Sequence, residues 1–571
     1  MAAPPWPSFP PRKKTTIQNS ASFSLLRSNR PPSENAFPGS YPPIAMRSRS
    51  RSCSEMSISL SASPSPAERE ALRLPRSPPA AAPPPLVGAL IESLSFRSCG
   101  FGRAASSAFE KEDLRLRVAL PQRLRDALHA ALKARDPSAG AFALEEAPGV
   151  GTAANPWFAL APEDAPENPL VAFVNPRSGG RLGPVLKSRL QELIGEDQVF
   201  DITVVKPSAF VEYGLGCLEQ LADSGDHSAR SVRNNLRVMV AGGDGTVGWV
   251  LGCLGELYVQ NRGPVPPVAV IPLGTGNDLS RSFGWGASFP FSWKAAAKRS
   301  LYKAILGTVS CLDSWHIVVS MPEEGEEQEL DLPHSLRHLG ECTFYDDGTA
   351  EGELSETVCC FDGVFYNYFS IGMDAQVAYG FHQLRDEKPF LASGPLSNKL
   401  IYAGYTCKQG WFFTQCISDP ELRGLTNIIR LSIKKMDSSE WEHIPVPSSV
   451  RAIVALNLHN YASGRNPWGN LKPEYLEKKG FVEAQSDDGL LEIFGLKQGW
   501  HASLVMVELI SAKHIAQAAA IRLEIKGGQW RDAYMQMDGE PWKQPLSTEY
   551  STFVDIKRVP YPSMIISGAD R

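Results

Sequence analysis

The ten cysteines of this 571-residue chain include no Cys-x-x-Cys pair. Zinc fingers and zinc ribbons need such pairs at fixed spacing, so the sequence excludes them. A disulfide scaffold is not expected in a chain of this size, and we predict reduced thiols in a cytosolic protein. The chain also lacks any run of about 18 consecutive apolar residues, the length that a membrane-spanning helix needs. The sequence therefore predicts neither a zinc module nor a spanning helix.

Charge of one sign is also missing. Lys and Arg number 57 and Asp and Glu 62, which gives a net charge of −5. A nucleic-acid-binding protein usually carries a marked basic excess, so we expect no nucleic-acid partner. The length is sufficient for two or three domains, each with its own hydrophobic core.

The first 105 residues have little aliphatic periodicity and are rich in Pro, Ser and Arg. Such a segment buries too little apolar surface to offset its ordering entropy, so we predict a disordered arm over residues 1–105. Up to Ala67, Glu34 and Glu55 are the only acids against eight Lys or Arg. That bias is typical of an organelle transit peptide, and plastid targeting is the alternative. We favour the disordered arm because the segment contains no amphipathic helix.

Helical periodicity begins with Leu124, Leu128 and Leu132, and we interpret residues 106–166 as a helical extension with a linker. Residues 167–314 then alternate between two patterns. Apolar runs of strand length begin at Leu170, Phe200, Leu236 and Val268, with helical spacing between them. This alternation predicts an α/β domain with a doubly wound, mostly parallel sheet. Ligands bind at the carboxyl ends of the strands in such a sheet.

Residues 315–571 contain short runs of β-branched and aromatic residues separated by turns. These runs predict a mainly β, sandwich-like accessory domain. An acidic, turn-rich insertion near residues 321–358 is expected to form a mobile loop. The apolar, alanine-rich stretch from His501 to Ala520 is predicted to be a helix.

The stretch Ala241–Thr246 reads AGGDGT and lies between a buried strand and a helical pattern. Glycines permit positive φ and leave backbone amides accessible, and amides at a helix start form an anion site. We interpret this turn as a phosphate nest, with Thr246 as N-cap. A carboxylate beside phosphates needs a cation or a transferable proton, which gives Asp244 a chemical role. The alternative is a tight turn in which Asp244 only caps the helix.

Two further strand ends carry similar turns, NPRSGG from Asn175 and GTGND from Gly274. The chain lacks the GxxxxGK[ST] loop, a strand-turn-helix GxGxxG and the HRD and DFG motifs of protein kinases. We therefore predict a nucleotide held mainly by backbone amides, without a P-loop lysine.

The three turns, each after a strand, resemble the catalytic domain of the diacylglycerol kinases. VFYNYFSIGMDAQVAYGFH from Val364, LNLHNYASGRNPWG from Leu456 and QMDGEPWKQP from Gln536 are similar to the accessory domain of that family. The resemblance runs from Asn168 to the C-terminus. The cysteine-rich C1 fingers and the EF-hand loops of animal members are absent, so the chain resembles the short plant-type enzymes.

The resemblance implies transfer of the γ-phosphoryl group of ATP to the hydroxyl of 1,2-diacylglycerol, which gives phosphatidate for phospholipid signalling. It implies catalytic roles for Asp244, whose loss is expected to be most damaging, and for Asp488, which we favour as the base. Magnesium is expected on Asp244, Asp488 and Asp538. Nucleotide contacts are expected from Asn175, Ser178, Gly179, Gly180, Gly242, Gly243, Gly245, Thr246, Gly274, Thr275, Gly276, Asn277 and Glu540. Ordinary turns are the alternative at Asp487–Gly489 and at MDGEP.

A substrate embedded in a membrane requires membrane contact, so we expect a cytoplasmic, peripherally associated protein. The aromatic segment Phe283–Trp293, with Trp285 and Phe289, and the basic edge Arg430–Lys435 are the predicted contact surfaces. The alternative is that these aromatic residues pack inside the protein.

Two other functions compete. One is a sphingoid-base or ceramide kinase of the same superfamily, because the acceptor site cannot be identified from one sequence. The other is an inactive lipid- or nucleotide-binding scaffold. The presence of carboxylates at Asp244, Asp488, Asp538 and Glu540 argues against the scaffold.

Overall fold

The computed structural model describes residues 111–145, 166–179, 182–290, 293–322, 332–339, 358–387, 424–436, 438–462, 464–467, 469, 471–497, 511–528 and 530–569. The chain divides into two units, residues 1–100 and 101–571, and all of these ranges belong to the second. The predicted arm over residues 1–105, Gly180 and most of the predicted acidic insertion lie outside the described residues.

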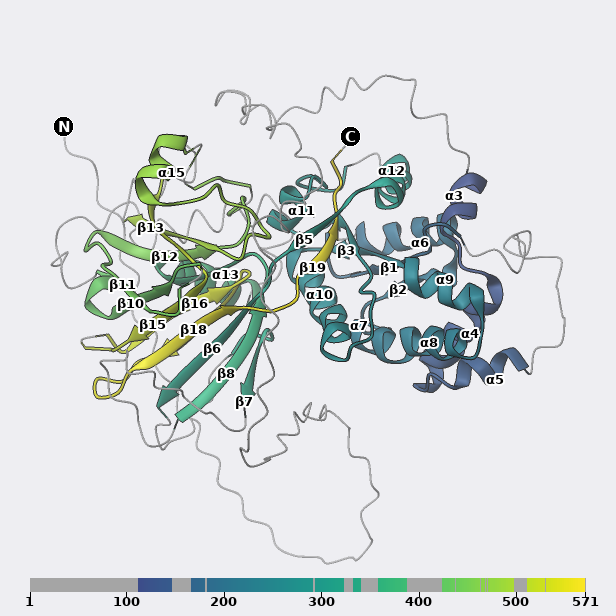
Figure 1. Ribbon diagram of the computed structural model, residues 1–571, viewed down its shortest axis with the longest axis horizontal. Helices are drawn as coiled ribbons and strands as arrows, with labels where there is room; N and C mark the ends of the chain where they lie inside the picture. The colour runs from purple at the N-terminus through teal and green to yellow at the C-terminus, as the bar shows by residue number, and fades with distance from the viewer. Residues whose placement is uncertain are drawn as a thin grey trace, which may run out of the picture. The chain divides into compact units, whose positions relative to one another are not determined.

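The first lobe is built on a six-stranded sheet with the order β2-β1-β3-β4-β19-β5 (Figure 1). Its strands are β1 (Leu170–Val174), β2 (Val199–Asp201), β3 (Arg237–Gly242), β4 (Val268–Pro272), β5 (Val309–Leu312) and β19 (Ser563–Ile566). Only β5 runs antiparallel to its neighbour, so the predicted doubly wound, mostly parallel sheet is confirmed.

Both faces of this sheet are buried, which explains why its strands are continuous apolar runs. Along β1, Leu170, Ala172 and Val174 enter one core, while Val171 and Phe173 enter the other. Helices cover both cores, as Figure 1 shows. One face packs α3 (Lys111–Val118), α6 (Leu182–Ile194) and α12 (Trp293–Leu306), and the other packs α4 (Gln122–Ala134), η3 (Phe210–Leu215), α8 (Gly216–Asp223), α9 (His227–Asn235) and α10 (Asp244–Val259).

Short elements connect these helices and strands. They are α5 (Ala139–Glu145), η2 (Glu196–Gln198), α7 (Pro207–Ala209) and α11 (Asp278–Ser282). The helix predicted from Leu124 is confirmed as α4, and its leucines at 124 and 128 are buried.

The second lobe is a sandwich of two antiparallel sheets, as predicted. The seven-stranded sheet has the order β11-β10-β15-β18-β6-β8-β7 and the six-stranded sheet the order β14-β13-β12-β9-β16-β17. Their strands are β6 (Trp315–Pro322), β7 (Leu336–Leu339), β8 (Val358–Phe365), β9 (Tyr368–Gly372), β10 (Ile429–Lys434), β11 (Glu442–Ile444), β12 (Val450–Leu456), β13 (Leu491–Lys497), β14 (Lys513–Ala518), β15 (Ala520–Ile525), β16 (Asp532–Met537), β17 (Glu540–Pro545) and β18 (Thr552–Arg558). One apolar core containing Trp315 and Trp542 lies between the sheets.

Helix α13 (Met373–Glu387) packs Val377 into a separate small core against the six-stranded sheet, and two short helices, η5 (Leu425–Asn427) and α15 (Pro473–Lys479), complete the lobe. The helix predicted over His501–Ala520 is wrong in its described part, where β14 and β15 form instead. Strand β7 also occupies part of the segment predicted to be a loop.

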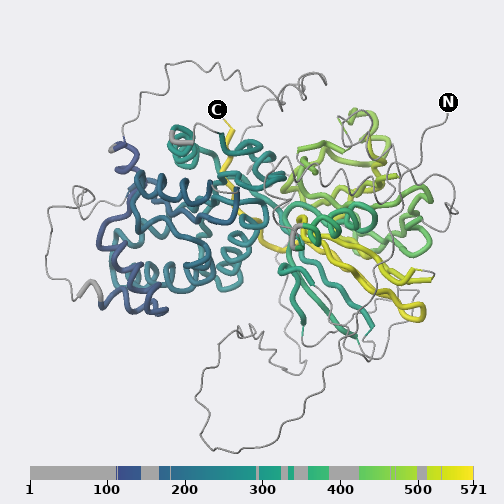
Figure 2. The backbone as a smooth tube through the Cα atoms, turned by 180° about the vertical axis from the view of Figure 1, so that it is seen from behind, coloured from purple at the N-terminus to yellow at the C-terminus, as the bar shows by residue number. Residues whose placement is uncertain are grey.

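The C-terminal segment returns to the first lobe. After β18 the chain leaves the sandwich, and β19 inserts between β4 and β5 (Figure 2, yellow). The first lobe is therefore completed by residues more than 250 positions beyond β4. The predicted first domain ends at residue 314 and does not include this strand.

The described cysteines Cys217, Cys253 and Cys311 have free thiols. Cys360 in β8 is disulfide-bonded and departs from the prediction that the thiols are reduced.

Candidate active site

Three turns meet at the carboxyl edge of the first sheet, because β1, β3 and β4 are neighbours and run parallel. The Asn175 side chain donates from Nδ2 to Thr246 Oγ1 at 2.9 Å, which joins the first turn to the second. A Cβ added to Gly274 would lie 2.7 Å from Gly243 Cα, so the second turn touches the third. The predicted grouping of Asn175, Gly243, Thr246 and Gly274 is therefore present.

The glycines of the central turn are needed for close approach. Gly242, Gly243 and Gly245 do not have positive φ, contrary to one part of our interpretation. A Cβ on Gly242 would lie 2.5 Å from the Thr246 Cβ, and one on Gly243 would lie 3.2 Å from Gly274 Cα. Any side chain at Gly242 would thus displace helix α10 from the end of β3.

Helix α10 begins at Asp244, so its N-cap is Gly243 and the predicted N-cap Thr246 is wrong. Asp244 and Gly245 are its first two residues, and backbone N–H groups at a helix start have no acceptor within the helix. Gly245 is exposed, which leaves its amide accessible to an anion. The helix forms because Val247, Val250, Leu251, Leu254 and Leu257 recur at helical spacing and are buried.

The third turn is held by Asn277. This residue has φ +54°, and its Oδ1 accepts from Gly274 N while its Nδ2 donates to the Gly274 and Ala287 carbonyls. Its side chain is committed to the turn itself. Two other residues of this turn were predicted to contact nucleotide: Thr275 is exposed and Gly276 is half-buried. On the first turn, the predicted contacts Ser178 and Gly179 are also half-buried.

Asp244 lies at the centre of the site and accepts three hydrogen bonds on one oxygen. Its Oδ2 receives Asp278 N at 2.7 Å, Leu279 N at 3.3 Å and Asn367 Nδ2 at 2.9 Å. The first two are the leading amides of α11, so Asp244 caps that helix, not its own as in the alternative we considered. The third donor comes from the second lobe. Because Oδ2 is saturated, Oδ1 is the oxygen that remains for a proton or a cation.

Burial and neighbouring carboxylates raise the pKa of Asp244 to about 7, with burial the larger cause and Asp278 the next. Asp278 Oδ1 accepts from Gly464 N at 2.6 Å, which ties α11 to the loop after β12. Asp538 adds to the charge around Asp244. A carboxyl group with a pKa near neutrality is suited to proton transfer at physiological pH.

Asp538 mainly holds the backbone that carries Asn367. Its Oδ1 accepts from Asn367 N and Tyr368 N, and its Oδ2 accepts from Tyr366 N, at 2.8–2.9 Å. Burial raises its pKa to about 6, and Glu540 contributes. This predicted metal ligand therefore acts, within the structure, as a clamp on the Tyr366–Tyr368 turn.

Glu540 faces the glycine turn from the second lobe. Its Oε2 accepts from Ser335 N, and its Oε1 lies 4.0 Å from a Cβ built on Gly245. Glu540 and Asp244 therefore flank Gly245, where a phosphate is expected. Two carboxylates beside one phosphate repel it unless a cation lies between them.

Asp488 lies in a different cluster. It stands in the turn before β13, where its Oδ2 accepts from Gln485 N and its Oδ1 from Leu490 N. Its pKa is raised to about 7 by burial, with further contributions from Glu492 and Asp313, whereas Asp278 and Asp538 act on Asp244. The structure does not join Asp488 to the three turns, and its predicted roles as base and metal ligand stay predictions. Its observed contacts are those of an ordinary turn, the alternative considered for Asp487–Gly489.

The donors near Asp244 suit a hard divalent cation, which takes oxygen ligands and retains several waters. Within the described ranges, no group of three or more His, Cys, Asp or Glu side chains is arranged to hold a metal. Asn367 supplies a further oxygen, because its Oδ1 is buried and makes no hydrogen bond. An unsatisfied buried amide oxygen on a side chain that is bonded to the Asp244 carboxylate fits a cation site better than it fits a closed polar network.

Sequence reasoning missed Asn367 and underrated Asp278. Asn367 lies 123 positions from Asp244, so no local pattern could pair them. Its sequence signals were the polar Asn within the apolar run VFYNYFSIG and the place of that run in a stretch that resembles the accessory domain. Asp278 entered the predictions only as the last residue of the GTGND turn, and its backbone contact with Asp244 depends on the approach of two turns.

Comparison with known proteins agrees with this geometry. Residues 169–309 match the model of the diacylglycerol kinase catalytic domain, and residues 364–541 match that of the diacylglycerol kinase accessory domain. "Diacylglycerol kinase 4" of Arabidopsis thaliana is 63% identical over 464 residues, which cover 81% of this chain and 93% of that protein. The chain belongs to the diacylglycerol kinase family.

Other family members are similar over shorter or comparable lengths. "Diacylglycerol kinase 7" of Arabidopsis thaliana is 59% identical over 84% of this chain and 94% of its own length. "Diacylglycerol kinase 1" of Oryza sativa subsp. japonica is 38% identical over 69% of this chain and 78% of its own length. All three turns of the site lie within the matched catalytic domain. Asn367, Asp538 and Glu540 lie within the matched accessory domain.

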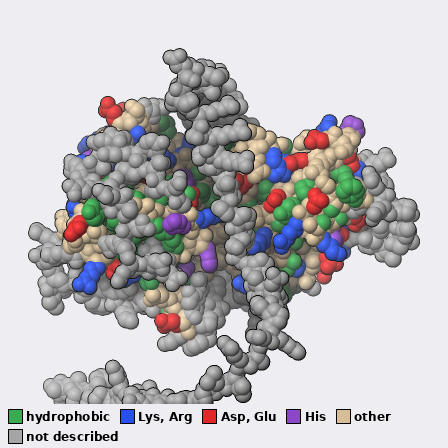
Figure 3. Space-filling model, turned by 90° about the horizontal axis from the view of Figure 1, so that it is seen from below, with side chains coloured by type: hydrophobic (Ala, Val, Ile, Leu, Met, Phe, Trp, Pro, Cys, Tyr) green, Lys and Arg blue, Asp and Glu red, His purple; other side chains and the backbone are tan. Residues whose placement is uncertain are grey.

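Part of the aromatic segment Phe283–Trp293, which was predicted to contact the membrane, is packed inside the protein. Trp285 donates from Nε1 to the Ile566 carbonyl of β19 at 2.7 Å and packs against both cores of the first lobe. Phe289 is half-buried against the core that α3, α6 and α12 cover. The packing alternative thus holds for Trp285. No helix among the described residues is long and apolar enough to span a membrane. On the face in Figure 3, basic and acidic side chains are interspersed.

Proposed function

We propose that this protein is an ATP-dependent kinase that phosphorylates 1,2-diacylglycerol to phosphatidate. The observation that carries the proposal is the Asp244 carboxylate, which stands at the start of α10 among phosphate-type turns and in contact with the second lobe. The family membership supports the substrate, since curated relatives are named diacylglycerol kinases.

The phosphates of ATP are held by the exposed amides at the start of α10 and by the adjoining turns at Asn175 and Gly274. Helix starts favour anions because of their unpaired N–H groups and the helix dipole. Asp244 Oδ1 takes the proton of the acceptor hydroxyl as that oxygen attacks the γ-phosphorus. The bond between the γ-phosphorus and the β,γ-bridging oxygen breaks, and ADP leaves with that oxygen. Oδ2 keeps its three donors throughout, so the carboxylate does not rotate during the transfer.

Magnesium with ATP is part of this proposal. Glu540 and Asn367 Oδ1 would hold the cation beside Asp244, whose Oδ1 is kept for the proton, and the cation would neutralise charge on the transferring phosphoryl group. Asn367 positions Asp244, and Asp538 in turn fixes the backbone of Asn367. The protein acts peripherally on membranes from the cytoplasmic side.

The test uses the purified full chain with labelled ATP, Mg²⁺ and mixed micelles that contain diacylglycerol, sphingosine or ceramide. We expect label on diacylglycerol. Asp244→Asn is expected to reduce the rate by about 10²–10⁴-fold, the usual contribution of a general base. Asn keeps an oxygen for the α11 amides, so it is a better variant than Ala.

The same assay decides between the alternatives. Label on sphingosine or ceramide alone would assign the chain to those lipid kinases, and no label on any lipid would favour an inactive scaffold. Asp488→Asn serves as the matched control, since Asp488 has a similarly raised pKa in a separate cluster. A loss as large as that of Asp244→Asn would restore Asp488 as the base.

A further inference from the structure

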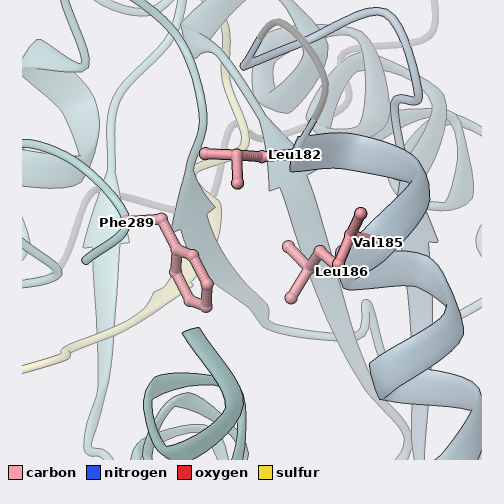
Figure 4. Close-up of a pocket in the computed structure, with 4 residues that line it drawn as sticks. All are labelled: Leu182, Val185, Leu186 and Phe289. Carbon is pink, nitrogen blue, oxygen red and sulfur yellow. The ribbon is translucent and has the colours of Figure 1, made fainter. Parts of the chain in front are cut away.

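An apolar surface is exposed at the start of α6. Leu182 and Val185 are 39% and 43% exposed, and with Leu186 and Phe289 they line an open, shallow hollow. Figure 4 shows Phe289 on one side of this hollow and the three α6 residues on the other. We call these four residues the α6 patch. The hollow is a shallow depression, so it suits contact with another surface better than enclosure of a small molecule.

The α6 patch adjoins the candidate active site. Leu182 N donates to the Gly179 carbonyl, and a Cβ on Gly183 would lie 2.8 Å from the Asn175 carbonyl oxygen. On the other side of the hollow, Phe289 N donates to the carbonyl of Pro272, the last residue of β4. The patch is thus anchored to the ends of β1 and β4, between which the Asp244 turn lies.

The sequence around the patch is basic. Residues 168–191 and 279–312 contain nine Lys or Arg and no Asp or Glu, in a chain whose net charge is −5. Lys187 and Arg189 are paired with acidic side chains, so part of this charge is neutralised. Arg177 and Arg299 are exposed, and Arg299 belongs to α12, which packs against α6. Basic residues around exposed apolar side chains complement an anionic lipid surface.

We propose that the α6 patch is the surface with which the protein docks onto a bilayer that contains anionic lipid. The inference rests on the proposed function, because diacylglycerol resides in a bilayer and its hydroxyl must reach Asp244. Leu182 and Val185 enter the headgroup boundary, and the basic side chains of the first lobe contact lipid phosphates. Self-association is a poorer account of the patch, since a stable dimer needs about 800 Å² per partner and four partly covered side chains fall far short.

The experiment measures sedimentation of the full chain with sucrose-loaded vesicles of phosphatidylcholine, with and without phosphatidate, in the absence of ATP. The variant Leu182→Asp/Val185→Asp places two charges in the contact and is expected to lower vesicle binding at least tenfold. Its matched control is Val259→Asp, which changes a residue that is 62% exposed at the far end of α10 and is expected to bind as the parent does.

A second variant tests the charge. Arg299→Glu is expected to weaken binding to phosphatidate vesicles about tenfold or more, since each charge near an anionic bilayer contributes ~1 kcal/mol and the substitution reverses one. Binding to phosphatidylcholine alone is expected to stay unchanged. Because Arg299 is exposed, this variant remains informative even where the double variant fails to fold.

Three results overturn the docking surface. They are no vesicle binding by the parent, unchanged binding by the double variant, and an equal loss in Val259→Asp. Sedimentation equilibrium that shows a dimer dissociated by the double variant would assign the patch to self-association instead. The kinase proposal fails separately, through absent phosphorylation by a chain that still binds vesicles through the patch.

Discussion

Asp244 has a structural and a proposed chemical function, and each uses a different oxygen of the carboxylate. Oδ2 caps α11 and accepts the Asn367 amide, while Oδ1 faces the proposed chemistry. The residue was identified from sequence because a carboxylate between glycines at a strand end is a local pattern. Its hydrogen-bond partner Asn367 was not, because Asn367 reaches the site only when the second lobe is folded. Asp538 was predicted as a metal ligand, and its bonds to the backbone around Asn367 were not.

Asn367→Leu tests the contact between the lobes. The substitution removes a charge-assisted hydrogen bond to Asp244 and an amide oxygen, and we expect kcat to fall about 10–100-fold, as for other groups that orient a metal ligand. Steady-state kinetics with diacylglycerol micelles over a range of Mg²⁺ concentrations measure it. We expect the half-saturating Mg²⁺ concentration to rise as well.

A matched control is Asn460→Leu, because Asn460 Nδ2 donates to Ser282 Oγ of α11 and not to a carboxylate. Equal kinetic losses in the two variants, or an unchanged Mg²⁺ requirement in Asn367→Leu, would reduce Asn367 to a structural role.

At the scale of elements, the first lobe was predictable and part of the second was not. Strands β1, β3 and β4 are apolar runs buried on both faces, so pattern and structure agree. The stretch His514–Ala520 is rich in alanine and favours a helix by intrinsic propensity. Pairing of β14 with β13 and of β15 with β10 and β18 overrides that preference, because it buries Ala516, Ala518 and Ile521 in the sandwich core.

Helix α13 is fixed at its first turn by a buried carboxyl group. Asp374 Oδ2 accepts from Ser370 Oγ of β9, Gln536 Nε2 of β16 and the Tyr461 hydroxyl at 2.6–2.8 Å. Burial raises the pKa of Asp374 above its ordinary value of 3.8, although these donors oppose the shift. Because the pKa is raised, the Asp374 carboxyl holds its proton in the folded state at pH values above 3.8, at which the same group has lost its proton in the unfolded chain.

The contribution of Asp374 to stability is therefore present below pH 3.8 and is lost as pH rises through its folded pKa. We expect Asp374→Asn to remove this part of the pH dependence, so that its unfolding temperature falls less between acidic and neutral pH than that of the parent. Thermal unfolding across pH measures the difference. Asp223→Asn changes an exposed carboxyl and is the control. Parallel curves for parent and Asp374→Asn would contradict the assignment.

For the whole molecule, the decisive feature is that the chain crosses between the lobes twice. It leaves the first lobe after β5 and returns as β19, which pairs with β4 and β5. The segment that forms β19 is the four residues SMII, too short and too far from β4 for its sheet to be read from sequence. Sequence patterns therefore predicted the α/β lobe and the β sandwich, but they did not reveal that the last strand of the chain belongs to the first lobe.

Truncation after Val559 tests this dependence. It removes β19 together with two acceptors and one donor of first-lobe hydrogen bonds. Trp285 donates to the Ile566 carbonyl, Lys303 donates to the Gly568 carbonyl, and Gly568 N donates to the Phe283 carbonyl. The edge of β4 is then unpaired and Trp285 loses its buried acceptor, so we expect insoluble protein or loss of cooperative unfolding. Solubility, thermal unfolding and hydrogen exchange at β4 measure the effect.

The same reasoning predicts that a fragment of residues 167–314 does not fold alone. A fragment of residues 111–314 joined by a flexible linker to residues 560–571 is expected to regain cooperative unfolding, because the linker supplies β19 at high effective concentration. A Met564→Asp/Ile565→Asp version of the linked fragment is the control, since Ile565 is fully buried in the first lobe. Cooperative unfolding of the truncated chain, or of both linked fragments alike, would show that the first lobe is complete without its last strand.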